Sequence, residues 1–390
     1  MSNFADKALL PTGMVDVLPP DAEFEAHVVE RLLASFKAYG YDQVKPPLIE
    51  FEESLLGTSG GAVANQTFRL MDPASQRMMG LRTDMTLQVA RIGTTRMKKA
   101  ARPLRLSYAG QVLRVKGSQL RPERQFGQVG VELIGSDNPA SDAEVIVMAV
   151  EALNALGSAE ISVDLGLPSL VSAVCSYLSI DDETNTRLQT TLDRKDLSGI
   201  NALADTLGPS ITATLSALLS AVGPVDSALK AVKEIDLSDA AAQQWQALVD
   251  TVGHIRQANS AISLTVDPVE NRGFEYHSGP TFTLFARGVR GELGSGGRYR
   301  AGNGDTPGEP STGLTLFMDT VLRSVTPPEE LRRLYLLHGT TPTVAKKFRD
   351  EGWSTLQGLN ETEDPKTEAM RLSCSHILVD GDARILKEDV

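Results

Sequence analysis

Apolar residues recur at helical spacing near the start of the chain and again through its middle. From Phe24 to Phe36 one returns every four positions, which predicts a helix that Asp21 caps and Gly40 ends. Between residues 166 and 260, leucine and alanine keep the same period, and glycine and proline only interrupt it. We therefore expect a mostly helical insert in this part of the chain.

Alternation of period two predicts two strands, over 103–116 and 124–135. In the second, one face is apolar and the other carries polar groups, glycine and one aromatic, which suits the floor of a cleft. If the two strands pair antiparallel, Arg114 comes close to Gln128 and Glu132. A buried arginine needs an anion, which a bound carboxylate or phosphate, or Glu132 itself, would supply. An ordinary sheet with one solvated face stays an alternative.

The remaining pattern completes the predicted organisation. Helices are expected over 86–100, over 142–156 with a Ser141–Glu144 capping box, and over 313–325; GELGSGGRYR (291–300) is expected to be a glycine-rich turn. After a Thr-Pro-Pro linker, the last segment follows the order β-α-β-α-β-β. We predict a core over 1–325, with the insert at 166–260, and a small α/β domain over 326–390.

Composition narrows the class of protein. The 390 residues carry a net charge of −12, which disfavours binding to a polyanion such as tRNA. No apolar run is long enough to span a membrane, and the N-terminus lacks a secretory signal. Two cysteines, Cys175 and Cys374, and five scattered histidines give neither a disulfide framework nor a metal-ligand spacing. We expect a soluble, cytoplasmic protein that needs no metal or cofactor.

Three further segments contain candidate chemistry. In GLRTDMT, Asp84 and Thr86 offer an acceptor and a hydroxyl at a helix start, although plain capping explains them equally. ENRGFEYHSG gathers Arg272, Tyr276 and His277, where one histidine in a loop is commonly only a surface residue. GSGGRY permits close backbone approach beside Tyr299, as a tight hairpin also would. No Gly-Lys-Ser/Thr phosphate loop follows it, and no nucleophilic triad is evident.

Six segments, in order, resemble the class II aminoacyl-tRNA synthetase core and histidyl-tRNA synthetase in particular. They are PTGMVDVLPP, YGYDQVKPPLIE, GLRTDMT, LRVKGSQLRPERQFGQVGVELIG, NRGFEYHSG, and GGRY with PSTGLTLFMDTVLR, which together cover roughly residues 10–325. The resemblance implies an α+β fold with an antiparallel sheet flanked by helices. It also implies a homodimer that forms through the first motif, where Pro46-Pro47 suits an interface edge.

The same resemblance implies a histidine-binding site made of Asp84, Thr86, Arg114, Gln128, Glu132, Arg272, Tyr276, His277 and Tyr299. Asp84, Thr86 and Gln128 are implied to hold the α-ammonium group. Arg114 is implied to meet the carboxylate and Glu132 the imidazole, with Tyr299 closing the site. The family has a tyrosine where this chain has His277, so selectivity for histidine is the weakest part of the comparison.

The ATP half of the family's site departs from the pattern. A working synthetase places an arginine that grips the ATP phosphates where this chain has Thr320, and an acidic residue where it has Lys116. Losing that guanidinium removes a charge-assisted contact with the phosphates. The last 65 residues are short for an anticodon-binding domain, and their 9 Lys plus Arg against 12 Asp plus Glu leave a net charge of −3.

This combination resembles the regulatory subunits of ATP phosphoribosyltransferase. That resemblance implies a noncatalytic protein without aminoacylation activity, which binds no tRNA. Its implied partner is the short-form catalytic subunit, in a hetero-octamer that carries out the first step of L-histidine biosynthesis. The regulatory subunit would activate that partner and confer feedback inhibition by L-histidine. Two alternatives stay open: a divergent active histidyl-tRNA synthetase, and an orphan binding module on the same scaffold.

Overall fold

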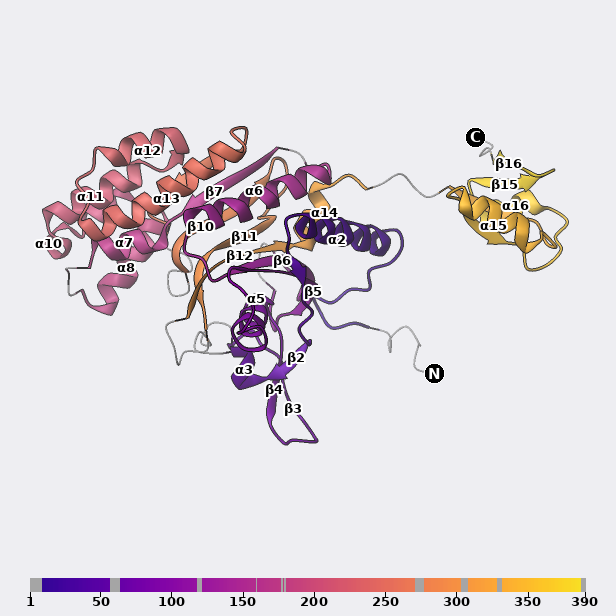
Figure 1. The fold of residues 1–390 in the computed structure, drawn as a ribbon, viewed down its shortest axis with the longest axis horizontal. Helices are drawn as coiled ribbons and strands as arrows, with labels where there is room; N and C mark the ends of the chain where they lie inside the picture. The colour runs from indigo at the N-terminus through magenta and orange to yellow at the C-terminus, as the bar shows by residue number, and fades with distance from the viewer. Residues whose placement is uncertain are drawn as a thin grey trace. The chain divides into compact units, whose positions relative to one another are not determined.

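The computed structural model describes residues 9–56, 64–117, 121–158, 160–176, 178, 180–270, 277–302, 308–327 and 332–386. The chain forms two compact units, Met1–Thr326 and Pro327–Val390 (Figure 1). Among the residues described, no helix combines the length and apolar character needed to cross a bilayer.

A nine-stranded sheet forms the centre of the first unit. In spatial order its strands are β1 (Asp42–Gln43), β5 (Leu104–Leu113), β6 (Gln125–Ile134), β12 (Glu309–Phe317), β11 (Gly294–Ala301), β10 (His277–Ala286), β7 (Ile161–Gly166), β9 (Ser263–Asp267) and β8 (Gly223–Pro224). Every neighbouring pair from β5 to β7 is antiparallel, whereas the pairs β1–β5 and β7–β9 are parallel. The sheet is therefore the expected, mainly antiparallel one.

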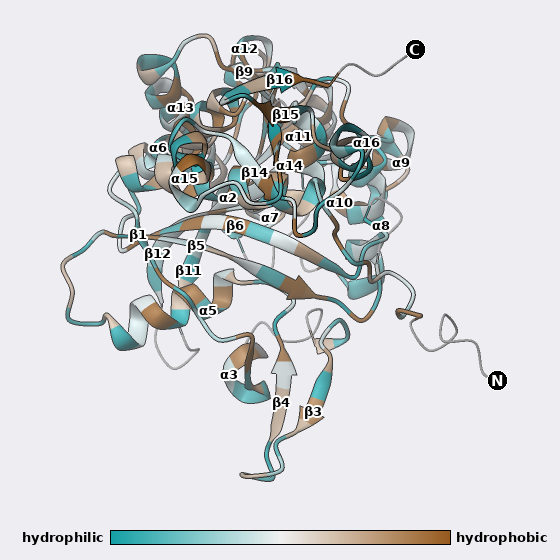
Figure 2. Cartoon of the chain, turned by 90° about the vertical axis from the view of Figure 1, so that its right-hand side faces the viewer, coloured by the Kyte–Doolittle hydropathy of each residue, from teal (hydrophilic) through white to brown (hydrophobic). Residues whose placement is uncertain are grey.

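Helices cover both faces of this sheet. Helices α2 (Asp21–Ala38) and α6 (Pro139–Ala155) pack on one face against the apolar residues of β6, and α5 (Thr86–Arg91) packs on the other (Figures 1 and 2). Because both faces of β6 are covered, every residue from Phe126 to Ile134 is buried. Polar side chains on this strand consequently need partners inside the protein.

The predicted helical insert is present and shares the hydrophobic core of the sheet. It contains α7 (Pro168–Val174), α8 (Asp182–Asp193), α9 (Leu197–Asn201), α10 (Ala204–Leu207), α11 (Pro209–Ser220), α12 (Val225–Lys233) and α13 (Asp239–Ala258). A buried ion pair fixes α6 to the sheet, because the fully buried Asp142 carboxylate accepts from Arg298 of β11 and from Thr312 of β12. Thr251 of α13 donates to the same carboxylate at 3.3 Å.

Two smaller sheets complete the chain. In the first unit, β2 (Ile49–Phe51), β4 (Met78–Leu81) and β3 (Arg69–Met71) pair antiparallel beside α3 (Glu52–Leu56), and the β3–β4 hairpin extends away from the large sheet (Figures 1 and 2). The second unit has the predicted order: β13 (Arg333–Leu336), α15 (Pro342–Asp350), β14 (Ser354–Gln357), α16 (Pro365–Arg371), β15 (His376–Val379) and β16 (Asp382–Ile385).

The structure corrects the predicted starts of two helices. Pro20, not Asp21, occupies the N-cap of α2, and Asp21 is its first helical residue. Helix α6 starts three residues before the predicted position, because Asn138 accepts from the Ala140 amide and Pro139 fits the first turn. The proposed Ser141–Glu144 capping box is therefore wrong.

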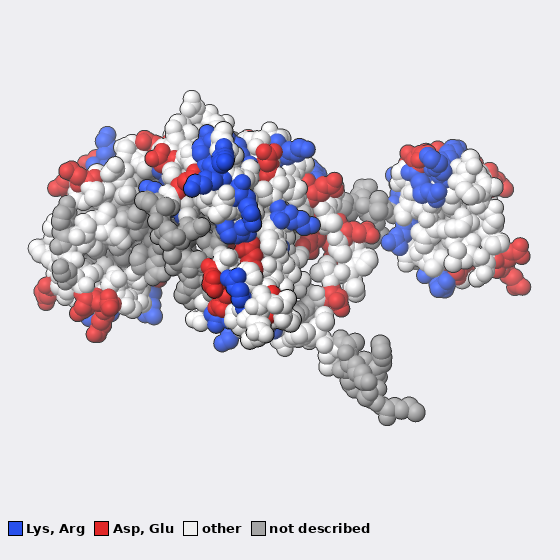
Figure 3. Space-filling view, turned by 60° about the horizontal axis from the view of Figure 1, so that its bottom comes forward, with Lys and Arg blue, Asp and Glu red and all other residues white. Residues whose placement is uncertain are grey.

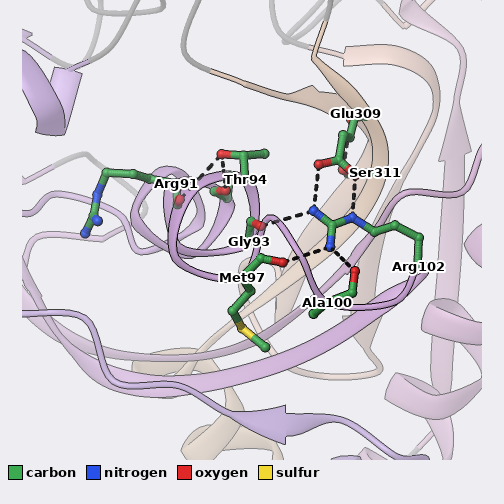
Figure 4. A network of polar contacts seen from close by, with 9 residues as sticks. Arg91, Gly93, Thr94, Met97, Ala100, Arg102, Glu309 and Ser311 are labelled. Carbon is green, nitrogen blue, oxygen red and sulfur yellow. Dashed lines mark hydrogen bonds and ion pairs between the residues drawn. The ribbon is translucent and has the colours of Figure 1, made fainter.

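The helix predicted over 86–100 is α-helical only as far as Arg91 and continues as a π-helix over Ile92–Arg96. Arg102 closes this wide turn by donating to the carbonyl oxygens of Gly93, Met97 and Ala100 at 3.0–3.1 Å (Figure 4). The same guanidinium pairs with Glu309 at the start of β12. Because the π-helical stretch is only five residues long, it is too short for hydrophobic periodicity to distinguish it from an α-helix.

Two glycine-rich predictions also change. The expected turn at 291–300 is largely strand β11, and the helix expected over 313–325 is the end of β12 followed by α14 (Met318–Ser324). The glycines serve close packing between strands: a Cβ on Gly296 would lie 2.1 Å from the carbonyl oxygen of Gly313. Glycine therefore allows close contact between neighbouring strands here, whereas the sequence pattern predicted a turn.

Candidate ligand-binding site

Four adjacent strands and one helix surround the buried carboxyl group of Glu132. Tyr299 of β11 donates to Glu132 Oε2 at 2.8 Å, and Tyr108 of β5 donates to Oε1 at 3.3 Å. Tyr108 also contacts the hydroxyls of Thr315 and Thr86, at 2.8 and 3.3 Å. We call these five residues the Glu132 cluster. Within the described part of the chain, no cation forms an ion pair with Glu132, so hydroxyl groups are its hydrogen-bond partners.

Two glycines leave the space that the side chains of this cluster occupy. Glu132 lies opposite Gly313 in the β6–β12 register, and a Cβ on Gly313 would lie 2.0 Å from Glu132 Oε2. A Cβ on Gly130 would lie 2.4 Å from the Tyr108 hydroxyl oxygen. Both glycines are needed because the neighbouring strand brings a polar side chain directly over them.

Burial changes the protonation of the cluster. Glu132 is 0% exposed, and desolvation raises its pKa to about 8, against the smaller opposing effects of hydrogen bonds from Tyr299 and Thr86. Burial also raises the pKa of Tyr108 well above its usual value. Glu132 is thus largely protonated at neutral pH, and a ligand that brings a basic nitrogen would share that proton.

A second group of polar contacts holds the start of α5 over β6. Gln128 is fully buried and donates from Nε2 to Asp84 Oδ2 at 2.9 Å, while its Oε1 accepts from the Met85 amide at 3.2 Å. Asp84 Oδ1 accepts from the Thr86 amide at 2.8 Å. Asp84, Thr86 and Gln128 therefore meet, and Thr86 joins this group to the Glu132 cluster.

Arg114 directly follows the last residue of β5, whereas Tyr108 of the Glu132 cluster lies in the middle of that strand. The β5–β6 register sets it opposite Arg124, and its amide donates to the Arg124 carbonyl oxygen at 2.7 Å. The prediction that Arg114 comes close to Glu132 is therefore wrong, because the antiparallel register sets Glu132 opposite Leu106, eight residues before Arg114. Burial lowers the pKa of Arg114, and among nearby carboxylates Asp84 opposes this most strongly. The Arg114 side chain is thus within electrostatic reach of Asp84.

Where the structure describes the chain, no carboxylate forms an ion pair with the Arg114 guanidinium. Its Cζ lies 5.1 Å from the centre of the Phe126 ring, and the structure records no ion pair or side-chain hydrogen bond for it within the described residues. A half-buried guanidinium in this setting is suited to pair with a carboxylate or phosphate.

A buried ion pair occupies the place where the family's ATP-gripping arginine is expected. Thr320 is buried and its hydroxyl accepts from Arg323 at 3.3 Å. Beside it, Arg121 donates to Asp319 at 2.8 Å, and the Arg121 Cζ lies 4.0 Å from the centre of the Phe317 ring. The Arg121 charge is thus directed to a carboxylate of the protein itself.

Positive charge is unevenly distributed in the chain. Residues 85–122 contain nine lysines and arginines and no aspartate or glutamate. Four of these cations form ion pairs with carboxylates from other segments, whereas Arg96, Lys98 and Lys99 are exposed. Figure 3 shows lysine and arginine side chains gathered across one face of the larger unit. The net charge therefore does not describe every face of the protein.

The structure brings together most of the predicted site residues that it describes. His277 of β10 lies opposite Tyr299, and its ring lies against Gly297, where an added Cβ would be 2.9 Å from His277 Cδ2. Arg272 and Tyr276 lie outside the described residues. Tyr108 and Thr315 were missed by the sequence analysis. In the described ranges, no three His, Cys, Asp or Glu side chains gather as metal ligands would.

Comparison with known proteins agrees with this geometry. The family model for histidyl-tRNA synthetase matches residues 13–321. The fold is similar to that of an ATP phosphoribosyltransferase regulatory subunit/histidyl-tRNA synthetase from Bacillus halodurans, with a TM-score of 0.82 at 24% identity over 95% of this chain and 97% of that one. It is also similar to histidyl-tRNA synthetase from a Nostoc species, with a TM-score of 0.77 at 16% identity over 95% and 91%. The fold is thus that of the histidyl-tRNA synthetase class.

Sequence relatives narrow this class. The chain is 54% identical to an ATP phosphoribosyltransferase regulatory subunit from Paramagnetospirillum magneticum, over 97% of this chain and 98% of the relative. It is 52% identical to one from Rhodospirillum centenum, over 96% and 95%. The chain belongs to the family of ATP phosphoribosyltransferase regulatory subunits.

Proposed function

We propose that this protein is a noncatalytic subunit that activates the short-form catalytic subunit of ATP phosphoribosyltransferase and makes it sensitive to L-histidine. The observation that carries this proposal is that a buried carboxyl group and a guanidinium both interact with Asp84. Among the described residues, Glu132 is a buried carboxyl group held only by hydroxyls, and Arg114 is a guanidinium that forms no ion pair.

Histidine carries the complementary groups. Its carboxylate would pair with Arg114, and its ammonium group would bind the Asp84–Gln128 pair together with Thr86. Its imidazole would share a proton with Glu132 beside Tyr299. We propose that Arg272, Tyr276 and His277 complete the site, as the resemblance to the synthetases implies. A ligand with this much differential contact can shift the complex between two states.

The proposal excludes aminoacylation. Thr320 cannot replace a phosphate-binding guanidinium, and the Arg121 charge nearby is already directed to Asp319. We therefore propose that the chain forms no aminoacyl adenylate and takes no tRNA. We further propose a cytoplasmic hetero-octamer with the catalytic subunit, in which the regulatory core dimerises.

Reconstitution with the short-form catalytic subunit tests the proposal. Complexes containing wild type, Arg114→Ala or Arg287→Ala are assayed for ATP phosphoribosyltransferase activity against L-histidine concentration. Arg287 is the matched control, since its ion pair with Glu160 lies on the surface. All three should assemble and be active. Losing a charged hydrogen bond of about 2 kcal/mol should raise the inhibitory histidine concentration about thirty-fold for Arg114→Ala alone.

Three results would contradict the proposal. If Arg114→Ala is inhibited as readily as wild type, histidine acts from another place, such as a subunit interface. If the purified chain catalyses histidine-dependent ATP–pyrophosphate exchange above background, with a working synthetase as positive control, it is a divergent synthetase. Failure to bind histidine at all, measured by calorimetry, would favour a binding module for some other ligand.

A further inference from the structure

Arg124 makes an unusual set of contacts around the backbone of Arg114. Its carbonyl oxygen accepts from the Arg114 amide at 2.7 Å, and its Nε donates to the Arg114 carbonyl oxygen at 3.2 Å. Both backbone polar groups of Arg114 are thus held by a single residue. Arg124 directs its charge at carbonyl oxygens and takes no part in the contacts of the Glu132 cluster.

The remaining contacts of Arg124 reach the N-terminal segment. Its Nη1 donates to the Thr12 carbonyl oxygen at 3.1 Å, and its amide donates to the Gly13 carbonyl oxygen at 2.8 Å. Its Cζ also lies 4.9 Å from the centre of the Phe68 ring. One guanidinium therefore connects the segment that precedes α2 with the strand end that carries Arg114.

The backbone conformation and small size of Gly13 suit its contact with Arg124. Its φ of +80° lies in the left-handed region, and a Cβ would lie 2.8 Å from Arg124 Cγ. Any other residue at this position would push the Arg124 side chain away from the N-terminal segment. The hydrogen bonds of Arg124 thus depend on the absence of a side chain at Gly13, although the two residues are more than 100 positions apart in the chain.

We infer that Arg124 is the positioning residue that sets Arg114 for a ligand carboxylate, and that Gly13 and the Thr12 carbonyl hold Arg124 in place. This inference rests on the proposed function, in which Arg114 meets the carboxylate of histidine. A change at residues 12–13 then reaches the ligand through Arg124 alone, without altering the Glu132 cluster. The effect is confined to the carboxylate end of the site.

Ligand discrimination tests this inference. Histamine has the imidazole and ammonium groups of histidine and lacks the carboxylate, so its binding does not depend on Arg114. Dissociation constants for both ligands are measured on wild type, Arg124→Ala, Arg124→Lys, Gly13→Ala and the surface control Arg287→Ala. Arg124→Ala should weaken histidine about ten-fold or more and leave histamine unchanged. Arg124→Lys should recover part of the loss, because a lysine reaches one carbonyl oxygen but not two.

Gly13→Ala should also weaken histidine binding and leave histamine binding unchanged, although residue 13 touches no ligand. If Arg124→Ala does not fold, the Gly13→Ala variant decides the question. An equal loss of affinity for both ligands would mean that Arg124 supports the fold in general. Unchanged histidine affinity in both Gly13→Ala and Arg124→Lys would mean that Arg124 does not position Arg114. Either result overturns the inference. If wild type binds no histidine, the proposed function fails instead, so the two failures are distinguishable.

Discussion

Replacing Glu132 by glutamine should change how stability depends on pH. The wild-type carboxyl has a pKa of about 8 in the folded protein, against an ordinary value of 4.5. Between these values the folded state holds a proton that the unfolded state has lost, so the free energy of unfolding falls as pH rises. Above about pH 8 both states are ionised and the decrease ends.

The size of this decrease follows from the pKa values. Each pH unit between them corresponds to about 1.4 kcal/mol, so the destabilisation reaches about 3 kcal/mol at pH 7 and about 5 kcal/mol above pH 8. Glutamine has nearly the same shape and keeps an oxygen to accept from Tyr299, but it does not titrate. Glu132→Gln should therefore gain stability over wild type as pH increases.

Urea unfolding at pH 5, 7 and 8.5 measures this difference. The chain has two tryptophans, Trp245 in α13 of the first unit and Trp353 in the second, so a Trp353→Phe background makes fluorescence report the first unit. Other titrating groups cancel because both proteins share them. The reasoning is refuted if the stability difference between Glu132→Gln and the parent is the same at pH 5 and pH 8.5.

Three other predictions concern the ion pairs, the ligand and the boundary of the first unit. Asp142→Asn should lower the free energy of unfolding by about 3 kcal/mol, because Arg298 stays buried without its charge partner. In the same urea titration, Arg287→Ala, which removes an exposed ion pair, should change the free energy of unfolding by less than about 0.5 kcal/mol. Histidine affinity, measured by calorimetry across pH, should be greatest between about pH 6.5 and 8, because the imidazole and Glu132 together then hold the one proton they share; a flat profile would contradict this. A chain of residues 1–326 should keep the histidine affinity of the full protein, and loss of binding on that truncation would show that the second unit contributes to the site.

The sequence was sufficient to predict the fold class, and several residues of the site follow from it for identifiable reasons. Glu132 interrupts an otherwise apolar stretch, and such a carboxyl requires a reason to be buried. Tyr299 stands beside glycines that allow another strand to come close. The Glu132 signal is local, so the pattern of the strand exposes it, whereas the role of Tyr299 came from the resemblance to the synthetases.

The errors came from features that depend on distant segments. Arg114 was placed beside Glu132 because alternation gives the face of a residue but not its register, which the antiparallel pairing sets. Tyr108 was missed because an aromatic residue on an apolar face looks like ordinary core, and only the neighbouring strand shows that its hydroxyl has a polar partner. Gly296 suggested a turn because glycine serves turns and close strand contacts equally.

Glu132 also bears on how this chain has evolved. A buried carboxyl that costs stability is readily lost once nothing selects for it, since a glutamine or a methionine at the same position would yield a more stable protein. The resemblance to the synthetases sets Thr320 where they carry an ATP-binding arginine, whereas the costly carboxyl is present together with Gly130 and Gly313, which give it room. If the proposed ligand site is what selects for Glu132, related chains should keep Glu132 and both glycines more consistently than the residue at the position of Thr320.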